Sequence, residues 1–331
     1  MKRYISVSLA ILCILLTTPS CGRQRYLSHT TWGMDTLVTI KIDKNTPDAE
    51  LIFSECDAIL SSLDSLMSRT NPESEVSRVN AVAGSAEVSA HTAAIIRTAL
   101  EVSELTGGSF DITVLPYVLM WERCGAENKL PDPGYIKELG DAVGYEKISL
   151  DGNTVKKNNE NTRIDLGAIA KGYACDRLVE YLVSAGVKYG LVSFGSNVAV
   201  IGEKPDGSEY RIGIKDPADT SRVAGYVSMS SGVLSVTGDY ERYVVIDGER
   251  YHHVINPFSG YPADTDLHSV AVICETGVLA DALSTALFVM GKEAALGLYE
   301  SGKIKFEALF IGDGEISRTP GLERKFEPAG Q

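Results

Sequence analysis

The segment Ile164-Asp165-Leu166-Gly167-Ala168-Ile169-Ala170-Lys171-Gly172 decides how the middle of this chain folds. It predicts a short strand that ends at Asp165, a turn that a glycine permits, and a helix whose apolar residues keep helical spacing. The start of such a helix leaves backbone N–H groups unpaired, and these suit a phosphate. Lys171 lies in the first turn, where a cation meets the unfavourable end of the helix dipole unless an anion binds there. The alternative is a solvated lysine beside a structural glycine.

A second segment, Thr276 to Gly291, is apolar nearly all round, which predicts a buried helix. Asp281 and Thr285 are four residues apart and share one face of that helix. A buried carboxylate needs partners because an unpaired charge is costly in the interior, and hard oxygen ligands suit Mg²⁺ better than zinc. The alternative is that Thr285 bonds back to the carbonyl four residues earlier while an Arg or Lys pairs with Asp281.

Three motifs stand out in chain order: D-L-G-A-I-A-K-G-Y-A from Asp165, H-V-I-N-P-F-S-G-Y-P from His253, and A-D-A-L-S-T-A-L from Ala280. In these motifs the sequence resembles the ApbE family, the FAD:protein FMN transferases. The resemblance extends from about Met34 to Met290 through five or six motifs in the family's order. It implies an α+β fold: a single ApbE-like domain, related to the T-fold, with a mixed or antiparallel sheet flanked by helices and a small polar inserted lobe.

The same resemblance implies a reaction. The family moves FMN from FAD to a Ser or Thr hydroxyl of a partner protein through a phosphoester bond, and AMP is released. Mg²⁺ would be held by Asp281, Thr285 and the carbonyl of Ala168, so that Asp281 is expected to be catalytic. His253 is the candidate base for the incoming hydroxyl. An exposed or core histidine is the alternative.

The residues expected to contact FAD, again by resemblance, are Met34, Thr70, Ser109, Phe110, Asp111, Asp165, Lys171 and Ile255. Two positions depart from the family's pattern. Asp35 replaces the usual glycine, and Ser68-Arg69-Thr70 stands where the family usually has Ser-Thr-Tyr. The missing aromatic removes a stacking contribution of about 1–3 kcal/mol, for which the guanidinium of Arg69 could compensate. Without the resemblance, Met34 is a core methionine at a strand and Asp111 closes a turn.

Two other functions compete with the transferase. With water in place of the acceptor hydroxyl, the same site is a Mg²⁺-dependent FAD pyrophosphatase that yields FMN and AMP. The other is a lipoprotein that binds flavin without chemistry. Asp281 and Thr285 speak against mere binding, because storage needs no metal pair.

The N-terminal 20 residues have the pattern of an export signal. Lys2 and Arg3 precede the apolar run Ile5 to Leu16, which is too short to span a bilayer. Cys21 follows small residues, as at a bacterial lipoprotein cleavage site, and we expect it to carry the lipid that anchors the chain. An ordinary secretory signal with a chance cysteine is the alternative. We divide the chain into a signal peptide (1–20), a tether (21–30) and the flavin transferase domain (31–331), with the inserted lobe at about 123–162.

The expected location is therefore the periplasmic face of the inner membrane. By resemblance, the expected acceptors are exported subunits of Na⁺-translocating quinone reductase or Rnf-type complexes. The full chain has a net charge of −13, and without Lys2 and Arg3 the 29 basic and 44 acidic side chains that remain give −15. Such a charge argues against nucleic acid as a partner. The four cysteines beyond residue 21 form no C-x-x-C pair, so we expect them in the core; an exported chain could also pair two of them.

The remaining pattern predicts a strand from Thr31 to Ile42, a helix opened by Pro47, and a helix over Ala90 to Leu105 that Ser89 caps. The lobe should hold a helix near Gly134 to Leu139 and a hairpin around Asp151-Gly152. Further strands are expected at 190–194, 199–201, 210–215, 225–230, 243–246 and 250–255, with turns at Asp206-Gly207 and Asp247-Gly248.

Overall fold

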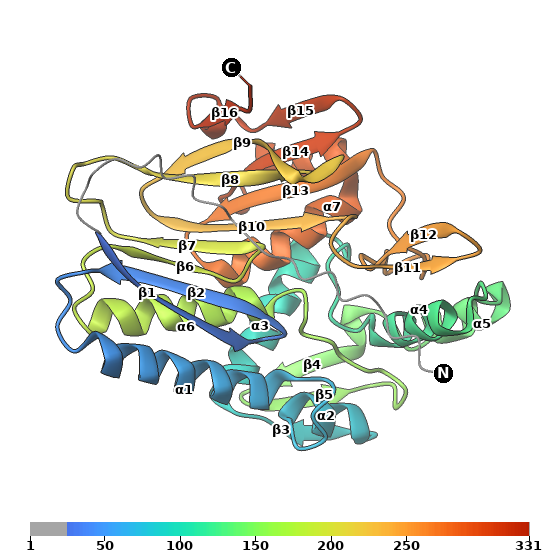
Figure 1. The fold of residues 1–331 in the computed structure, drawn as a ribbon. Coiled ribbons are helices and arrows are strands. Elements are labelled where there is room, and N and C mark those ends of the chain that lie inside the picture. The colour runs from blue at the N-terminus through green and yellow to red at the C-terminus, as the bar shows by residue number, and fades with distance from the viewer. Residues whose placement is uncertain (1–24, 331) are drawn as a thin grey trace, which may run out of the picture.

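The computed structural model describes residues 25–330, and its central layer is a sheet of eight strands in the order β1-β2-β6-β7-β10-β13-β14-β15 (Figure 1). Neighbouring strands of this sheet pair antiparallel. The strands are β1 (Tyr26–Gly33), β2 (Thr36–Asp43), β6 (Gly190–Ser193), β7 (Asn197–Ile201), β10 (Gly232–Gly238), β13 (Leu267–Cys274), β14 (Glu307–Gly312) and β15 (Glu315–Arg318). The expected α+β fold is confirmed.

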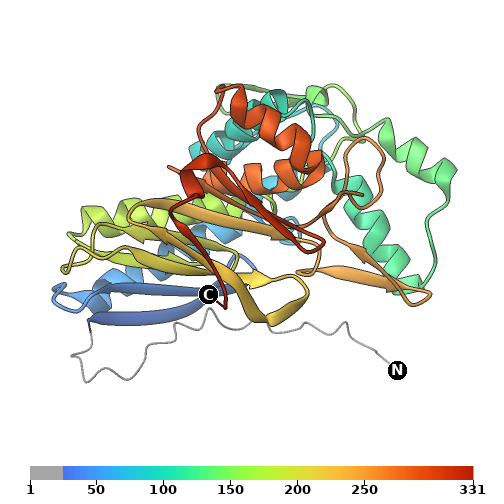
Figure 2. The same ribbon diagram turned by 90° about the horizontal axis from the view of Figure 1, so that it is seen from above.

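Helices cover one face of the sheet, as the view from above shows (Figure 2). Along β2, Val38, Ile40 and Ile42 alternate with more exposed residues and are fully buried under these helices, because side chains two apart on a strand share a face. The helices that contribute to this main core are α1 (Ala49–Met67), α2 (Glu75–Ala81), α3 (Ala90–Leu105), α6 (Ala170–Ser184) and α7 (Gly277–Glu300). Gly291 interrupts α7 with a φ of +75°.

The opposite face of the sheet packs on a smaller sheet of three strands. Leu191, Val198 and Leu234 point to this side and form a second apolar cluster with Ile212 and Val227. The small sheet has the order β16-β9-β8. Its strands are β8 (Tyr210–Asp216), β9 (Asp219–Met229) and β16 (Phe326–Pro328).

A third apolar cluster lies beside the sheet, where two helices pack against a hairpin (Figure 1). Trp121, Ile136 and Ile246 are buried in it. The elements are α4 (Leu115–Glu127), α5 (Pro133–Gly140), β11 (Tyr243–Ile246) and β12 (Glu249–His252). The predicted turn at Asp247-Gly248 joins the two strands, with φ of +52° and +87°.

The span 123–162 contains the expected helix, α5, and the expected hairpin, β4 (Ile148–Asp151) and β5 (Thr154–Lys157). The hairpin gains a third strand, β3 (Ser85–Glu87), and its Val155 joins the main core. Two short 3-10 helices, η1 (Tyr145–Lys147) and η2 (Pro320–Leu322), complete the described elements.

Several strand predictions are wrong. The span Thr31 to Ile42 is a hairpin of β1 and β2, turned by Met34 and Asp35, both at positive φ (+54° and +57°). Because β1 begins at Tyr26, residues 26–30 belong to the sheet and not to a tether. No strand ends at Asp165: Arg163 forms an isolated parallel bridge with Val114, and the Asp165 N–H donates to the Ile112 carbonyl at 2.7 Å.

The other differences are smaller. β12 ends at His252, three residues before the predicted end. The Asp206-Gly207 turn connects strands of different sheets, β7 and β8, so it closes no hairpin. Cys56, Cys124, Cys175 and Cys274 are buried and unpaired, as expected for core residues. The export segment and Cys21 lie outside the described residues, among which no helix is both long and apolar enough to cross a membrane.

Candidate functional site

The two segments singled out by the sequence meet where α6 crosses α7. The Gly172 N–H donates to Oδ2 of Asp281 at 2.9 Å, and the Lys171 ammonium lies 3.9 Å from the same oxygen. The helices approach so closely that a Cβ on Gly172 would lie 2.0 Å from the carbonyl oxygen of Gly277. The start of α6 therefore delivers a backbone donor and a cation to the carboxylate of α7.

Asp176, which sequence reasoning missed, fixes this crossing from the other side. Its carboxylate accepts from the N–H groups of Gly277 and Val278, so it caps the start of α7 from within α6. Burial raises the pKa of Asp176. The sequence did carry a signal, since Gly172 and Asp176 are four residues apart and share the face of α6 that meets α7.

Asp281 is 5% exposed and lies against the hydroxyls of β10. Its Oδ1 accepts from Ser235 at 3.1 Å, and Ser235 in turn accepts from the Asn197 amide at 3.0 Å. Ser235 was not predicted as a site residue. Ser235 belongs to the same strand face as Thr237, and that polar alternation within an apolar strand was the available signal.

Thr285 does not take the alternative expected for it. The hydroxyl that bonds back to the Asp281 carbonyl belongs to Ser284, at 2.9 Å. The Thr285 hydroxyl instead faces Thr237 at 3.4 Å. Thr285 is partly accessible, and Ser284 is fully buried, so Thr285 is the hydroxyl that remains available to a ligand.

The donor set decides which metal these residues fit. Within residues 25–330 no group of three or more His, Cys, Asp or Glu side chains is placed to hold a metal. Asp281 is a single carboxylate, and each of its oxygens keeps a lone pair beyond its hydrogen bond. One carboxylate, a hydroxyl and the carbonyl of Ala168 suit Mg²⁺, which is usually bound through one or two carboxylates, waters and substrate phosphates. These donor types are therefore those of a Mg²⁺ site and not of a zinc site.

Asp165 and Arg69 form the next part of the site. Oδ1 of Asp165 accepts from the Gly167 N–H at 2.8 Å, and Oδ2 pairs with Nε of Arg69 at 3.2 Å. Arg69 also pairs with Glu122 of α4. Lys171 closes the same turn, because its ammonium donates to the Gly167 carbonyl at 3.2 Å. The guanidinium of Arg69 is therefore paired with two carboxylates, those of Asp165 and Glu122.

Thr70 and the β1–β2 turn flank this ion pair. Thr70 is exposed, and its hydroxyl contacts that of Ser68 at 3.1 Å. The hydrogen bond to Glu122 and the charges of Asp165, Glu122 and Asp35 raise the pKa of Arg69 against the opposing effect of burial. Asp35 has a left-handed conformation, which glycine adopts without strain and which aspartate tolerates. The family's glycine and this aspartate are therefore compatible with one backbone, and the neighbouring Met34 is buried in the main core.

Asp111 closes a turn, as the alternative for it predicts. Its Oδ1 accepts from both the N–H and the hydroxyl of Thr113 at 2.7 Å, and burial raises the pKa of Asp111 to about 6. Phe110 is 2% exposed and Ile255 is 7% exposed, so both side chains pack into the protein interior. Ser109, which follows two glycines in the chain, is partly accessible.

His253 follows β12 and has an exposed side chain. Its Nδ1 lies 3.0 Å from the Arg242 carbonyl, which can only accept, so Nδ1 carries the proton and Nε2 is free to accept one. Desolvation of the ring by neighbouring protein atoms lowers the pKa of His253. The hydrogen bond to the Arg242 carbonyl raises it in part, and the charges of Arg242, His252 and Lys171 lower it. The ring is therefore neutral at pH 7, the form that a general base requires. His252 points elsewhere, toward the Ala263 carbonyl at 3.0 Å.

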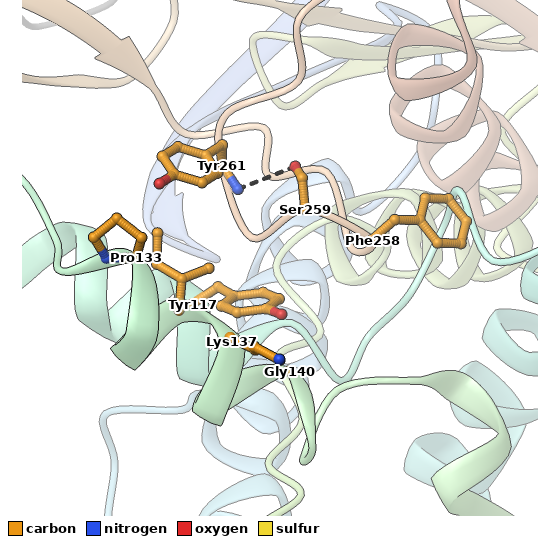
Figure 3. A pocket seen from close by; sticks show the side chains of 8 residues that line it. Tyr117, Pro133, Lys137, Gly140, Phe258, Ser259 and Tyr261 are labelled. Atoms are coloured by element: carbon orange, nitrogen blue, oxygen red, sulfur yellow. Dashed lines mark hydrogen bonds between the residues drawn. The ribbon is translucent and has the colours of Figure 1, made fainter.

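A pocket of about 290 Å³ opens between the α4–α5 pair and the loop after His253 (Figure 3). None of its lining residues is among the predicted catalytic, FAD-binding or metal-binding residues, so we do not assign the transfer reaction to this pocket. Phe258 lines it, although in Figure 3 its ring points away from Tyr117 and Tyr261. The lining residues are Tyr117, Pro133, Ile136, Lys137, Gly140, Phe258, Ser259 and Tyr261.

Comparison with known proteins gives consistent matches. The model of the ApbE family matches residues 34–310. The FAD:protein FMN transferases of Vibrio cholerae and Treponema pallidum are 31% and 32% identical, over 90% and 94% of this chain and 91% and 92% of theirs. The crystal structure of the ApbE protein of Thermotoga maritima has a TM-score of 0.82 at 33% identity, covering 91% of this chain and 100% of that one. The flavin transferase ApbE from Vibrio cholerae has a TM-score of 0.78 at 27% identity, over 89% and 96% of the two chains.

Proposed function

The chain belongs to the ApbE family, and on that premise we propose that it transfers FMN from FAD to a serine or threonine hydroxyl of a partner protein. The product is a phosphoester, and AMP is released. The observation that carries the proposal is the contact of Gly172 N–H and Lys171 with the buried carboxylate of Asp281. That contact brings a phosphate-binding helix start and a metal-type carboxylate into one place.

The reaction exchanges one phosphorus–oxygen bond for another. The acceptor hydroxyl attacks the FMN phosphorus, the bond to the bridging oxygen breaks, and AMP leaves with that oxygen. Lys171 and the start of α6 hold and partly neutralise the diphosphate. The hydroxyl proton passes to Nε2 of His253, which is unprotonated in the structure's tautomer. Asp165, braced by Arg69, would contact FAD.

Mg²⁺ would be held by Asp281, Thr285 and the Ala168 carbonyl together with the diphosphate. When bound, it would stabilise negative charge on the phosphoryl oxygens. Ser235 and Asn197 keep the Asp281 carboxylate oriented toward the substrate side of α7. Removal of the divalent ion with a chelator is expected to stop transfer while the protein stays folded.

One observation favours a second candidate, hydrolysis of FAD to FMN and AMP. Thr70 is exposed and lacks an aromatic ring, so this position does less to hold the dinucleotide against water. The experiment that separates the candidates mixes the protein with FAD, Mg²⁺ and an acceptor domain that carries a target threonine. Flavin bound covalently to the acceptor supports the transferase, free FMN supports hydrolysis, and unchanged FAD leaves only a flavin carrier.

We also propose that the protein acts outside the cytoplasm, anchored by lipid on Cys21 at the periplasmic face of the inner membrane. The acceptors would be exported subunits of Na⁺-translocating quinone reductase or Rnf-type complexes. The export-type segment and the net charge support this location and speak against nucleic acid. In cell fractionation, Cys21→Ser should move the protein from the membrane to the soluble fraction. A variant that stays in the membrane fraction would contradict the anchor.

A further inference from the structure

Phe258 is a large apolar side chain that the fold leaves exposed at the edge of the site. It follows His253 by five residues and is 68% exposed. The loop beneath it is tightly bonded: Phe258 N–H donates to the Asn256 side chain at 2.9 Å, and Asn256 exchanges backbone bonds with Gly260 and Tyr261. Trp121 adds a bond from its indole N–H to the Gly260 carbonyl at 2.8 Å. The exposed ring therefore projects from a fixed turn.

One side of the Phe258 ring has protein support. A Cβ on Gly108 would lie 3.4 Å from Cε1 and Cζ of the ring and 3.5 Å from Cε1 of Tyr145. Gly108 has a φ of +88°, a backbone conformation that glycine adopts readily, and its lack of a side chain lets the ring approach closely. The ring points away from Tyr117 and Tyr261 of the pocket (Figure 3). It thus rests against the loop before Ser109 and presents the remainder of its surface to solvent.

None of the predicted FAD contacts presents an exposed aromatic ring. Thr70 has a hydroxyl where the family usually has a ring, Phe110 is 2% exposed, and Ile255 is aliphatic and buried. Arg69, the other candidate for stacking, is occupied by Glu122 and Asp165. FAD has two flat aromatic ring systems, and each gains free energy when it leaves water against an aromatic side chain.

We propose that Phe258 is a stacking platform for one aromatic ring system of FAD. This inference rests on the proposed function and adds a substrate-positioning residue to its site. The ring is supported on one side and open on the other, which is the arrangement that stacking needs. Loss of one base-stacking contact is expected to raise the Kd about 5- to 150-fold.

The test measures binding of FAD to the wild type, Phe258→Ala and Phe258→Tyr by equilibrium dialysis, with flavin fluorescence as a second readout. Phe258→Ala should weaken FAD binding by the stated factor and leave the melting temperature unchanged, because the side chain is exposed. Phe258→Tyr should bind like the wild type. Tyr243→Ala is the matched control: it removes another exposed aromatic ring, 46% exposed on β11, and should leave the Kd for FAD unchanged.

A further measurement sharpens the result. FMN and ADP as separate probes identify the ring system, because only the one that contains the stacked ring should lose affinity in Phe258→Ala. Unchanged Kd values for FAD, FMN and ADP in Phe258→Ala would overturn the inference. A wild type that binds FAD but transfers no FMN would instead count against the proposed function. The Kd values would still show whether Phe258 stacks on FAD.

Discussion

Gly172→Ala is the substitution for which the structure gives the sharpest expectation. The added Cβ would lie 2.0 Å from the Gly277 carbonyl oxygen, 2.5 Å from its carbon and 2.7 Å from Cβ of Asp281. Two of these atoms are backbone and the third is the first side-chain atom of Asp281, so no flexible group can swing aside. The start of α7 must move away from α6 by about 1 Å or more, because non-bonded atoms essentially never approach a Cβ within about 3.0 Å.

The displacement acts on both stability and activity. Overpacking of this kind costs about 1–3 kcal/mol of unfolding free energy. Because Asp281 moves with α7, its hydrogen bond from the Gly172 N–H lengthens, and a misplacement of about 1 Å can lower a reaction rate about 100-fold. The assay is single-turnover transfer of FMN to the acceptor domain, with thermal unfolding measured in parallel.

Gly297→Ala is the matched control, since it lies in the same helix and a Cβ there meets nothing within 4 Å. It should keep the wild-type rate and gain about 0.5–1 kcal/mol from the higher helix propensity of alanine. Gly172→Ala with wild-type rate and melting temperature would refute the inferred crossing of α6 and α7.

Three other substitutions probe separate parts of the site. His253→Ala should slow transfer and largely keep FAD binding. Because the pKa of His253 is lowered, the wild-type rate should stay flat through pH 6–7, where an ordinary histidine titrates, and fall only at lower pH. A wild-type rate that declines through pH 6.5, or an unchanged rate in the variant, would remove His253 as the base. Burial raises the pKa of Asp111 to about 6, so the folded chain keeps a proton that the unfolded chain has lost between about pH 4 and 6, and stability from this group fades as the pH rises through that range. Asp111→Asn should therefore gain stability over the wild type at pH 7.5 but not at pH 4.5 in denaturant unfolding, and an equal change at both pH values would contradict this. Arg69→Ala should weaken FAD binding more than Glu122→Gln does, because only the first frees Asp165; equal effects in a dialysis assay would show that the Arg69–Asp165 pair has no role in binding.

The helices could be predicted from the sequence because their signal is local. Apolar residues at helical spacing located α1, α3, α6 and the first part of α7, and Ser89 caps α3 by accepting from Thr92 N–H. The buried helix that carries Asp281 was predicted for the reason that proved correct, since it is apolar on nearly all sides.

The β1–β2 hairpin could not be predicted in the same way. Its turn is made by Met34 and Asp35 at positive φ, where the usual turn signal is glycine or asparagine. Without that signal, the apolar alternation of β2 predicts one strand that continues back into the residues of β1. The segment before Asp165 has the composition of a strand, but only one bridge, to Val114, pairs with it. Strand formation depends on a partner that the local sequence does not reveal.

Lys171 and Asp281 were singled out from the sequence, and the structure brings them together. Asp281 and Lys171 belong to motifs, whereas Ser235 and Asp176 are ordinary polar residues until the fold brings them to α7. Their importance comes from burial and from contacts with residues distant in sequence. Such contacts follow from the sheet order, which the chain's local pattern does not specify.

The proposed reaction depends on the carboxylate of Asp281, and Asp281→Asn tests this dependence most directly. The amide keeps the size of the side chain and one acceptor for the Gly172 N–H, but it removes the charge. Wild type and variant are incubated with FAD, Mg²⁺ and the acceptor domain, and the acceptor is analysed by mass spectrometry for covalent FMN. We predict a flavin adduct with the wild type and none with the variant, at matched circular dichroism. An adduct formed by Asp281→Asn at the wild-type rate would contradict the proposed centre.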